Sequence, residues 1–223
     1  MGDIRRLIAF DLDGTLIDSS ADLASAANAL IVERGGARLP DGAVVGMVGD
    51  GAAMLVKRAL TATGLPFDAA SVERFLALYD ERLLETTVAY AGIREALEAL
   101  APHGALAVLT NKPIGPTRKV LAGLGLAPFF ASVIGGDSPF GRKPDPAALR
   151  HLLSEHRADP GASIMIGDSR VDLETGRAAG TAVCLTRYGF GYQGFDGFVP
   201  GARERVVGTP AEISAVVQTL LAI

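Results

Sequence analysis

The sequence is poor in cysteine, histidine and aromatic residues: 223 residues include one cysteine, three histidines and no tryptophan. A single cysteine, Cys184, excludes an internal disulfide and suits a reducing cytoplasm. Because Cys184 lies within the apolar run 181–186, we expect it to be buried in a strand rather than to act as a reactive thiol. The histidines have no acidic or cysteine partner at ligand spacing, so we expect them to be solvated.

Long apolar runs are also absent, although 49% of the residues are hydrophobic. No run approaches the roughly 18 residues that span a bilayer, and the first residues lack the apolar core of a signal peptide. We therefore expect a cytoplasmic protein with no membrane partner, either a monomer or a homodimer. The formal net charge of −4 excludes a broad attraction to nucleic acid, so an anionic ligand must be captured by a few placed groups.

Five short apolar runs are predicted to be buried parallel strands: residues 6–10, 105–110, 131–136, 163–167 and 181–186. Helical patterns lie between them, at residues 92–100, 116–125, 145–156 and 172–180. This alternation predicts an α/β fold with a doubly wound parallel sheet, a Rossmann-like core.

Residues 19–88 break the alternation, because they contain helical patterns and no convincing strand. A crossover between neighbouring strands does not need so long a segment. We therefore predict an inserted all-helical domain at residues 19–89, with the core formed by residues 1–18 and 90–223. This insertion would lie at the edge of the sheet above the first strand, where a lid would sit.

Polar residues follow several of the predicted strands. Asp11 and Asp13 follow the first, Thr110, Asn111 and Lys112 follow the second, and Asp168 follows the strand at 163–167. Ligands of open α/β sheets bind beyond the carboxyl ends of the strands. The sequence therefore places these groups on one rim of the sheet.

Lys143 and Asp172 are expected to join this group, and together the residues suggest metal and phosphate chemistry. Several carboxylates in one crevice repel each other, and a hard cation such as Mg²⁺, which prefers carboxylate oxygens, relieves the repulsion. Thr110 and Lys143 would then bind the oxygens of a phosphate. Asp11 and Asp13 can serve as nucleophile and general acid, and Gly14 lets the chain turn away from the phosphate.

Four ordered segments carry a family resemblance: "DLDGTL" at 11–16, "TN" at 110–111, "KP" at 143–144 and "GDSRVD" at 167–172. They resemble the four motifs of the haloacid dehalogenase-like hydrolase superfamily. The resemblance extends over essentially the whole chain, and the helical insertion is similar to that family's C1-type cap. It implies a phosphatase with a Mg²⁺ cofactor and a small phosphate ester as its partner.

The resemblance also implies roles for individual residues. Asp11 would attack phosphorus and become an aspartyl-phosphate, and Asp13 would protonate the leaving alcohol and then activate water. Mg²⁺ would be held by Asp11, by the backbone carbonyl of Asp13 and by Asp168. Lys143 would stabilise the charge on phosphate and nucleophile, and the remaining motif residues would bind the phosphoryl oxygens (Thr110 and Asn111). Asp172 would support either the metal site or Lys143. It would do so either as a direct metal ligand or by contacting the residues that hold the metal.

Within this superfamily, the segments 48–60, 90–100, 109–113 and 184–192 resemble the phosphoglycolate phosphatase group, so 2-phosphoglycolate is the expected substrate. Gly49 and Gly51 open a helix whose free N–H groups could face a substrate carboxylate, or they could only form a tight turn. Asp50 would disfavour an anionic substrate if it pointed inward. Lys57 and Arg58 follow on the same helix, as binding groups or as solvated charges.

Two alternative functions share parts of this pattern. A β-phosphoglucomutase-type phosphomutase has the same motifs and the same kind of inserted domain. A phosphoryl-accepting receiver domain also carries acids, a threonine and a lysine on an α/β sheet, but the "DLDGT" spacing and the long insertion argue against a receiver. A dehalogenase would have no need for Asp13 or for Mg²⁺.

Overall fold

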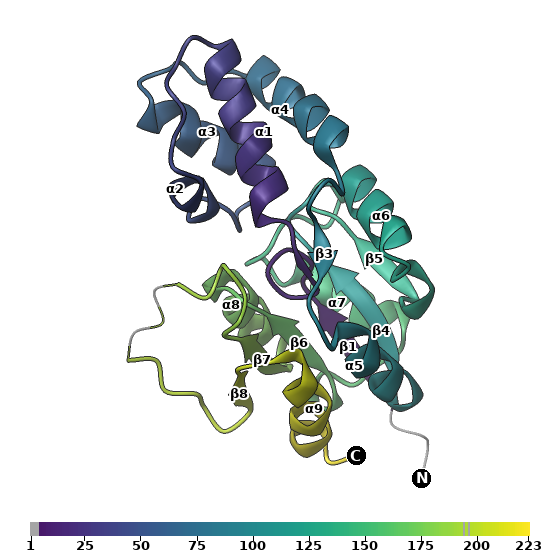
Figure 1. Cartoon of the computed structure of the whole chain (residues 1–223). Coiled ribbons are helices and arrows are strands. Elements are labelled where there is room, and N and C mark those ends of the chain that lie inside the picture. The colour runs from purple at the N-terminus through teal and green to yellow at the C-terminus, as the bar shows by residue number, and fades with distance from the viewer. Residues whose placement is uncertain (1–4, 194, 196) are drawn as a thin grey trace.

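The computed structural model describes residues 5–193, 195 and 197–223, and its centre is a six-stranded parallel sheet. The strands lie in the order β5–β4–β1–β6–β7–β8 (Figure 1), and each neighbouring pair is parallel. Their bounds are β1 Leu7–Phe10, β4 Ala105–Leu109, β5 Ser132–Ile134, β6 Ile164–Gly167, β7 Ala182–Thr186 and β8 Glu204–Val207. The doubly wound α/β class predicted from the sequence is confirmed.

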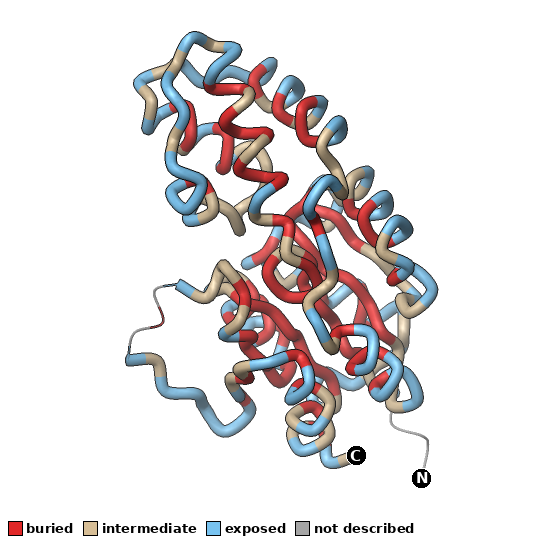
Figure 2. Tube along the Cα trace, viewed as in Figure 1, coloured by how far each residue is buried: buried red, intermediate tan, exposed pale blue. Residues whose placement is uncertain are grey.

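Helices cover both faces of this sheet: α5 Ile93–Leu100, α6 Ile114–Gly123, α7 Ala147–Glu155, α8 Arg170–Ala179 and α9 Ile213–Leu221. Side chains alternate along β1. Ile8 and Phe10 pack in one core with α5, α6 and α9, whereas Leu7 and Ala9 pack in a second core with α7. Both faces of β1 are therefore buried (Figure 2), which explains why the strand is apolar throughout.

Four further helices form a separate lobe at one end of the molecule (Figure 1): α1 Ser20–Glu33, α2 Asp41–Val45, α3 Ala52–Ala62 and α4 Ala69–Arg82. We refer to residues 20–82 as the helical module. It has its own apolar core, which includes Leu30, Ile31, Leu60 and Phe75. The helices predicted within the insertion are therefore present and pack on one another rather than on the sheet.

Two short strands connect the helical module to the sheet. β2 Ile17–Asp18 and β3 Val88–Ala89 pair in antiparallel fashion, with Asp18 opposite Val88. Next to them, the buried carboxylate of Asp22 accepts hydrogen bonds from the N–H and hydroxyl groups of Thr86 and Thr87. The expectation that residues 19–88 contain no strand is therefore wrong at Val88, because a two-residue strand is too short to show alternation.

The sequence analysis also did not identify β8 or α9. β8 forms the edge of the sheet and carries Glu204 and Arg205, so it lacks the apolar run that marks the buried strands. Cys184 is fully buried in β7, as expected. Among the described residues we find no helix with both the length and the apolar character of a membrane span.

Candidate active site

Asp11 and Asp13 lie directly beyond β1, at the carboxyl edge of the sheet. The backbone N–H of Asp11 donates to Ile166 O at 2.8 Å, so the extended chain continues to this residue. Both acids line the same cavity between the sheet and the helical module. Each has its own lysine: Lys143 for Asp11 and Lys112 for Asp13.

Lys143 is buried between two acids. Its Nζ lies 2.7 Å from Asp11 Oδ1 and 2.6 Å from Asp172 Oδ1. Burial alone would lower the pKa of Lys143, but the two carboxylates outweigh burial and raise its pKa above the usual value. Lys143 is therefore a fixed positive charge behind Asp11.

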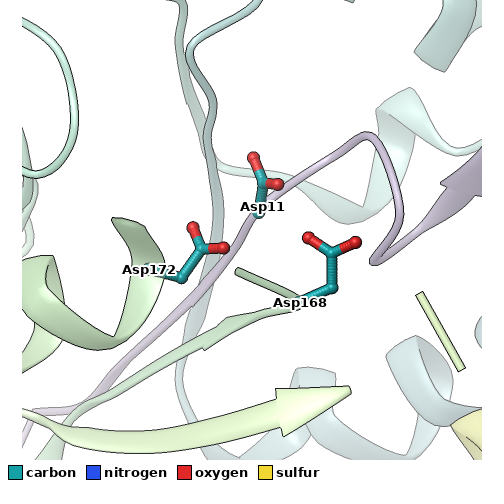
Figure 3. Close-up of side chains that lie close together, drawn as sticks. All are labelled: Asp11, Asp168 and Asp172. Atoms are coloured by element: carbon teal, nitrogen blue, oxygen red, sulfur yellow. The ribbon is translucent and has the colours of Figure 1, made fainter. Parts of the chain in front are cut away.

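Three acids meet at this point, because carboxylate oxygens of Asp11, Asp168 and Asp172 lie within 4.8 Å of one another (Figure 3). Burial raises the pKa of Asp11 from 3.8 to about 6, although Lys143 opposes the shift. Burial also raises the pKa of Asp168 well above its ordinary value, and Asp11 and Asp172 add to the rise. One lysine does not balance three buried carboxylates, so the cluster favours a further positive charge.

Asp172 is more deeply buried than the other two acids, and both of its carboxylate oxygens accept hydrogen bonds. Its Oδ1 accepts from Lys143, and its Oδ2 accepts from the N–H and hydroxyl of Ser169 at 3.0 and 2.6 Å, which forms a capping box at the start of α8. Asp11 and Asp168 line the cavity, whereas Asp172 does not. Of the two roles that the sequence left open, this arrangement favours support of Lys143.

Gly14 and Gly191 shape the position of Asp168. Gly14 has a φ of +85°, and a Cβ atom there would lie 1.8 Å from Asp168 Oδ2. The backbone N–H of Gly191 donates to the same oxygen at 2.7 Å. A side chain at position 14 would therefore displace an acid of the cluster.

Thr110 and Asn111 follow β4, and both line the cavity. The side-chain amide of Asn111 donates to the carbonyls of Gly49 and Lys143, both at 3.0 Å. Asn111 thus connects the helical module to the sheet. The predicted binding of phosphoryl oxygens by Thr110 and Asn111 agrees with this position and stays a prediction.

A family model described as haloacid dehalogenase-like hydrolase matches residues 8–186. The chain belongs to the haloacid dehalogenase-like hydrolase family. The resemblance inferred from the four motifs is thereby confirmed. The match extends over the acid cluster, both lysines and the whole helical module.

Several curated relatives of this haloacid dehalogenase-like hydrolase carry the name phosphoglycolate phosphatase. The one from Rhodospirillum rubrum is 44% identical over 194 residues, which cover 83% of this chain and 80% of the relative. The one from Haemophilus influenzae is 38% identical over 196 residues, which cover 84% of this chain and 88% of the relative. The crystal structure of a predicted phosphoglycolate phosphatase from Haemophilus somnus matches with a TM-score of 0.85 at 29% identity, covering 98% of this chain and all of that one.

In this haloacid dehalogenase-like hydrolase, Gly49 and Gly51 line the cavity just before α3, with φ angles of +127° and +89°. Asp50 pairs with Arg58, and both face a neighbouring groove rather than the main cavity. Lys57 is exposed and does not line the cavity. The basic pair on α3 therefore does not meet the acid cluster, and Asp50 does not point at it.

The sequence analysis placed Lys112 at a strand end without giving it a role in the site, and it missed Tyr79. Lys112 Nζ lies 2.9 and 3.1 Å from the two carboxylate oxygens of Asp13 and 2.7 Å from the hydroxyl of Tyr79 on α4. Ser19 also donates its hydroxyl to Asp13. The position of Lys112, directly after Asn111 beyond a strand, is a usable signal. Tyr79 gives none, because it looks like any core residue of an amphipathic helix.

The cavity encloses about 650 Å³, including space open to solvent. The sheet contributes its polar floor, and the helical module contributes an apolar roof that includes Leu23, Val48, Leu55 and Phe75. Such a roof excludes water from the acids below it, and the space suits a small metabolite.

Proposed function

We propose that this chain is a Mg²⁺-dependent phosphomonoester hydrolase that acts through an aspartyl-phosphate, with 2-phosphoglycolate as its substrate. The observation that carries the proposal is the buried pair of Asp11 and Lys143, set beside Asp13 and Asp168 in one cavity. Positioning and charge neutralisation supply most of the acceleration of phosphoryl transfer, and this arrangement is suited to both.

Asp11 is the nucleophile of the proposed reaction. Its carboxylate attacks phosphorus in line with the leaving oxygen, and the P–O bond to the alcohol breaks as the new P–O bond forms. Lys143, at 2.7 Å, offsets the charge on the nucleophile and on the phosphoryl group. Thr110 and Asn111, at the adjacent strand end, contribute donors to the phosphoryl oxygens.

Asp13 is the general acid and base. It gives its proton to the leaving alcohol oxygen, and then removes a proton from the water that attacks the aspartyl-phosphate. Ser19 and Lys112 fix its carboxylate by hydrogen bonds, so the acid is oriented before the substrate arrives.

The donor set fits Mg²⁺, because Asp11 and Asp168 present hard carboxylate oxygens that lie close together and carry raised pKa values. These two residues, with the backbone carbonyl of Asp13, would hold the ion. When bound, it supplies positive charge next to the phosphate oxygens. The Gly14 backbone, with no side chain, leaves room for Asp168 in this set.

Two observations support 2-phosphoglycolate among small esters. The curated relatives at 37 to 44% identity are named phosphoglycolate phosphatase, and a lysine, Lys112, lines the cavity beside Asp13.

A phosphate-release assay with Mg²⁺ tests the proposal, using 2-phosphoglycolate, glycerol phosphates, hexose phosphates and p-nitrophenyl phosphate. We expect the highest kcat/KM for 2-phosphoglycolate and loss of all release in Asp11→Asn. An exposed acid far from the cluster, in Glu98→Gln, is the matched control. Interconversion of glucose phosphates without phosphate release would instead indicate the phosphomutase, and no release from any ester would refute the proposal.

A further inference from the structure

Lys112 is the one cationic side chain that lines the cavity within the part of the chain that the structure describes. Lys143 approaches Asp11 from behind and does not reach the lining. A substrate with a phosphate and a second anionic group needs two positive poles. With Mg²⁺ held by Asp11 and Asp168, that cluster would attract the phosphate, which leaves Lys112 for the other group.

The ammonium of Lys112 is held in place from two sides. Asp13 accepts from it on the sheet, and the hydroxyl of Tyr79 accepts from it on the helical module. The Tyr79 ring also lies under Lys112 Nζ, at 4.4 Å from the ring centroid, and Phe75 stacks on this ring. Lys112 is 6% exposed, so its charge acts in a desolvated space, where it is weakly screened.

Lys112 lies beside Asp13, the acid proposed to protonate the leaving group, so it would face the leaving-group side of a bound ester. Asp13 must approach the ester oxygen to about 3 Å in order to protonate it. Lys112 Nζ is 2.9 Å from Asp13 Oδ1. A group attached to the carbon next to the ester oxygen therefore comes close to Lys112, whereas a group several bonds away extends toward the apolar roof.

We propose that Lys112 is a specificity-determining residue that binds the carboxylate of phosphorylated α-hydroxy acids, the class to which 2-phosphoglycolate belongs. The inference rests on the phosphatase function proposed above and names the contact that selects its substrate. Tyr79 is the positioning residue that keeps the ammonium extended toward the cavity.

The competing explanation is that Lys112 only neutralises Asp13. Two substrates separate the explanations: 2-phosphoglycolate and 2-hydroxyethyl phosphate, which has a similar length and no carboxylate. A residue that acts through Asp13 alone affects both esters equally, because both need the same proton. A residue that binds the carboxylate affects 2-phosphoglycolate far more.

The experiment measures kcat and KM of the full chain with Mg²⁺ for both esters, in wild type, Lys112→Met and Tyr79→Phe. Lys57→Met, which removes an exposed lysine outside the cavity, is the matched control. We expect wild type to prefer 2-phosphoglycolate by about 100-fold or more, because one well-placed polar contact discriminates at least this strongly. Lys112→Met should remove most of this preference, mainly through KM, and Tyr79→Phe should reduce it by a smaller factor.

Equal losses on both esters in Lys112→Met would overturn the inference and leave Lys112 as a partner of Asp13. A wild-type enzyme that hydrolyses both esters equally well overturns it too, and this arm does not depend on whether the variant folds. If no ester at all is hydrolysed, the proposed phosphatase function fails instead, so the two failures are distinguishable.

Discussion

The raised pKa of Asp11 makes a quantitative prediction about how protons and Mg²⁺ compete for the acid cluster. Burial raises the pKa of Asp11 from 3.8 to about 6 in the folded protein, whereas the unfolded chain titrates near the ordinary value. Without metal, the folded state therefore binds more protons between these values. Because of this, the stability that Asp11 contributes is complete below pH 3.8 and is lost as the pH rises through 6.

The size of the effect follows from the shift. A rise in pKa from 3.8 to about 6 corresponds to about 3 kcal/mol of unfolding free energy, at about 1.4 kcal/mol for each tenfold change. Asp11→Asn removes this dependence, because asparagine does not ionise. About a third of this free energy is already lost at pH 4.5, so in the metal-free protein we expect the unfolding free energy of the variant to rise by about 2 kcal/mol relative to wild type between pH 4.5 and pH 7.5.

Urea denaturation in EDTA at these two pH values measures the gain, and Glu98→Gln, an exposed acid outside the cluster, is the control. In saturating Mg²⁺ we expect this gain to disappear at pH 7.5, because the ion stabilises the ionised cluster of wild type and binds the variant more weakly. A difference between wild type and Asp11→Asn that stays constant with pH in EDTA would contradict the burial-driven shift. The reasoning about a charge-deficient cluster would then have to be abandoned.

Three further substitutions test single parts of the site. Asp13→Asn should lower kcat/KM, which reports the step that releases the alcohol, about 100- to 10,000-fold for alkyl esters and much less for p-nitrophenyl phosphate, because only the alkyl leaving group needs the proton; equal losses in kcat/KM exclude Asp13 as the acid. Asp172→Asn removes one of the two buried partners of Lys143 and should cost about 3 kcal/mol of unfolding free energy, so an unchanged urea midpoint refutes its supporting role. Gly14→Ala places a methyl group 1.8 Å from Asp168 Oδ2 and should weaken Mg²⁺ binding in calorimetry. Gly35→Ala, at a φ of +82° with nothing within 4 Å, is its control and should leave the affinity unchanged.

The sequence predicts the parts of this fold that are buried on both sides. The runs that became β1, β4, β6 and β7 are apolar throughout because helices cover both faces of the sheet. β8 has an exposed edge and carries charged residues, so its pattern does not differ from that of a loop. The two-residue strands β2 and β3 are defined only by their pairing, which no local pattern encodes.

The candidate site, like the fold, has parts that the sequence predicts and parts that it does not. The acids at strand ends could be located from the sequence, because the topology of a parallel sheet brings its carboxyl ends together. The contact between Lys112 and Tyr79 could not, since it joins residues 33 positions apart, one beyond a strand of the sheet and one on the helical module. Whether Asp172 faces a metal or a lysine likewise depends on side-chain packing that only coordinates show.

The pairing of β2 with β3 means that the chain leaves the sheet and returns to it at the same place. Asp18 and Val88 are direct neighbours across this ribbon, and Asp22 ties the outgoing helix to Thr86 and Thr87 on the way back. The residues between β2 and β3 therefore form a single insertion in an otherwise continuous α/β domain. Another folded segment with adjacent ends can be spliced in at that point while β1 and its acids stay where they are. Exchanging the insertion would therefore change the apolar roof and remove the contact of Tyr79 with Lys112, whereas Lys112 itself and the acids would stay on the sheet.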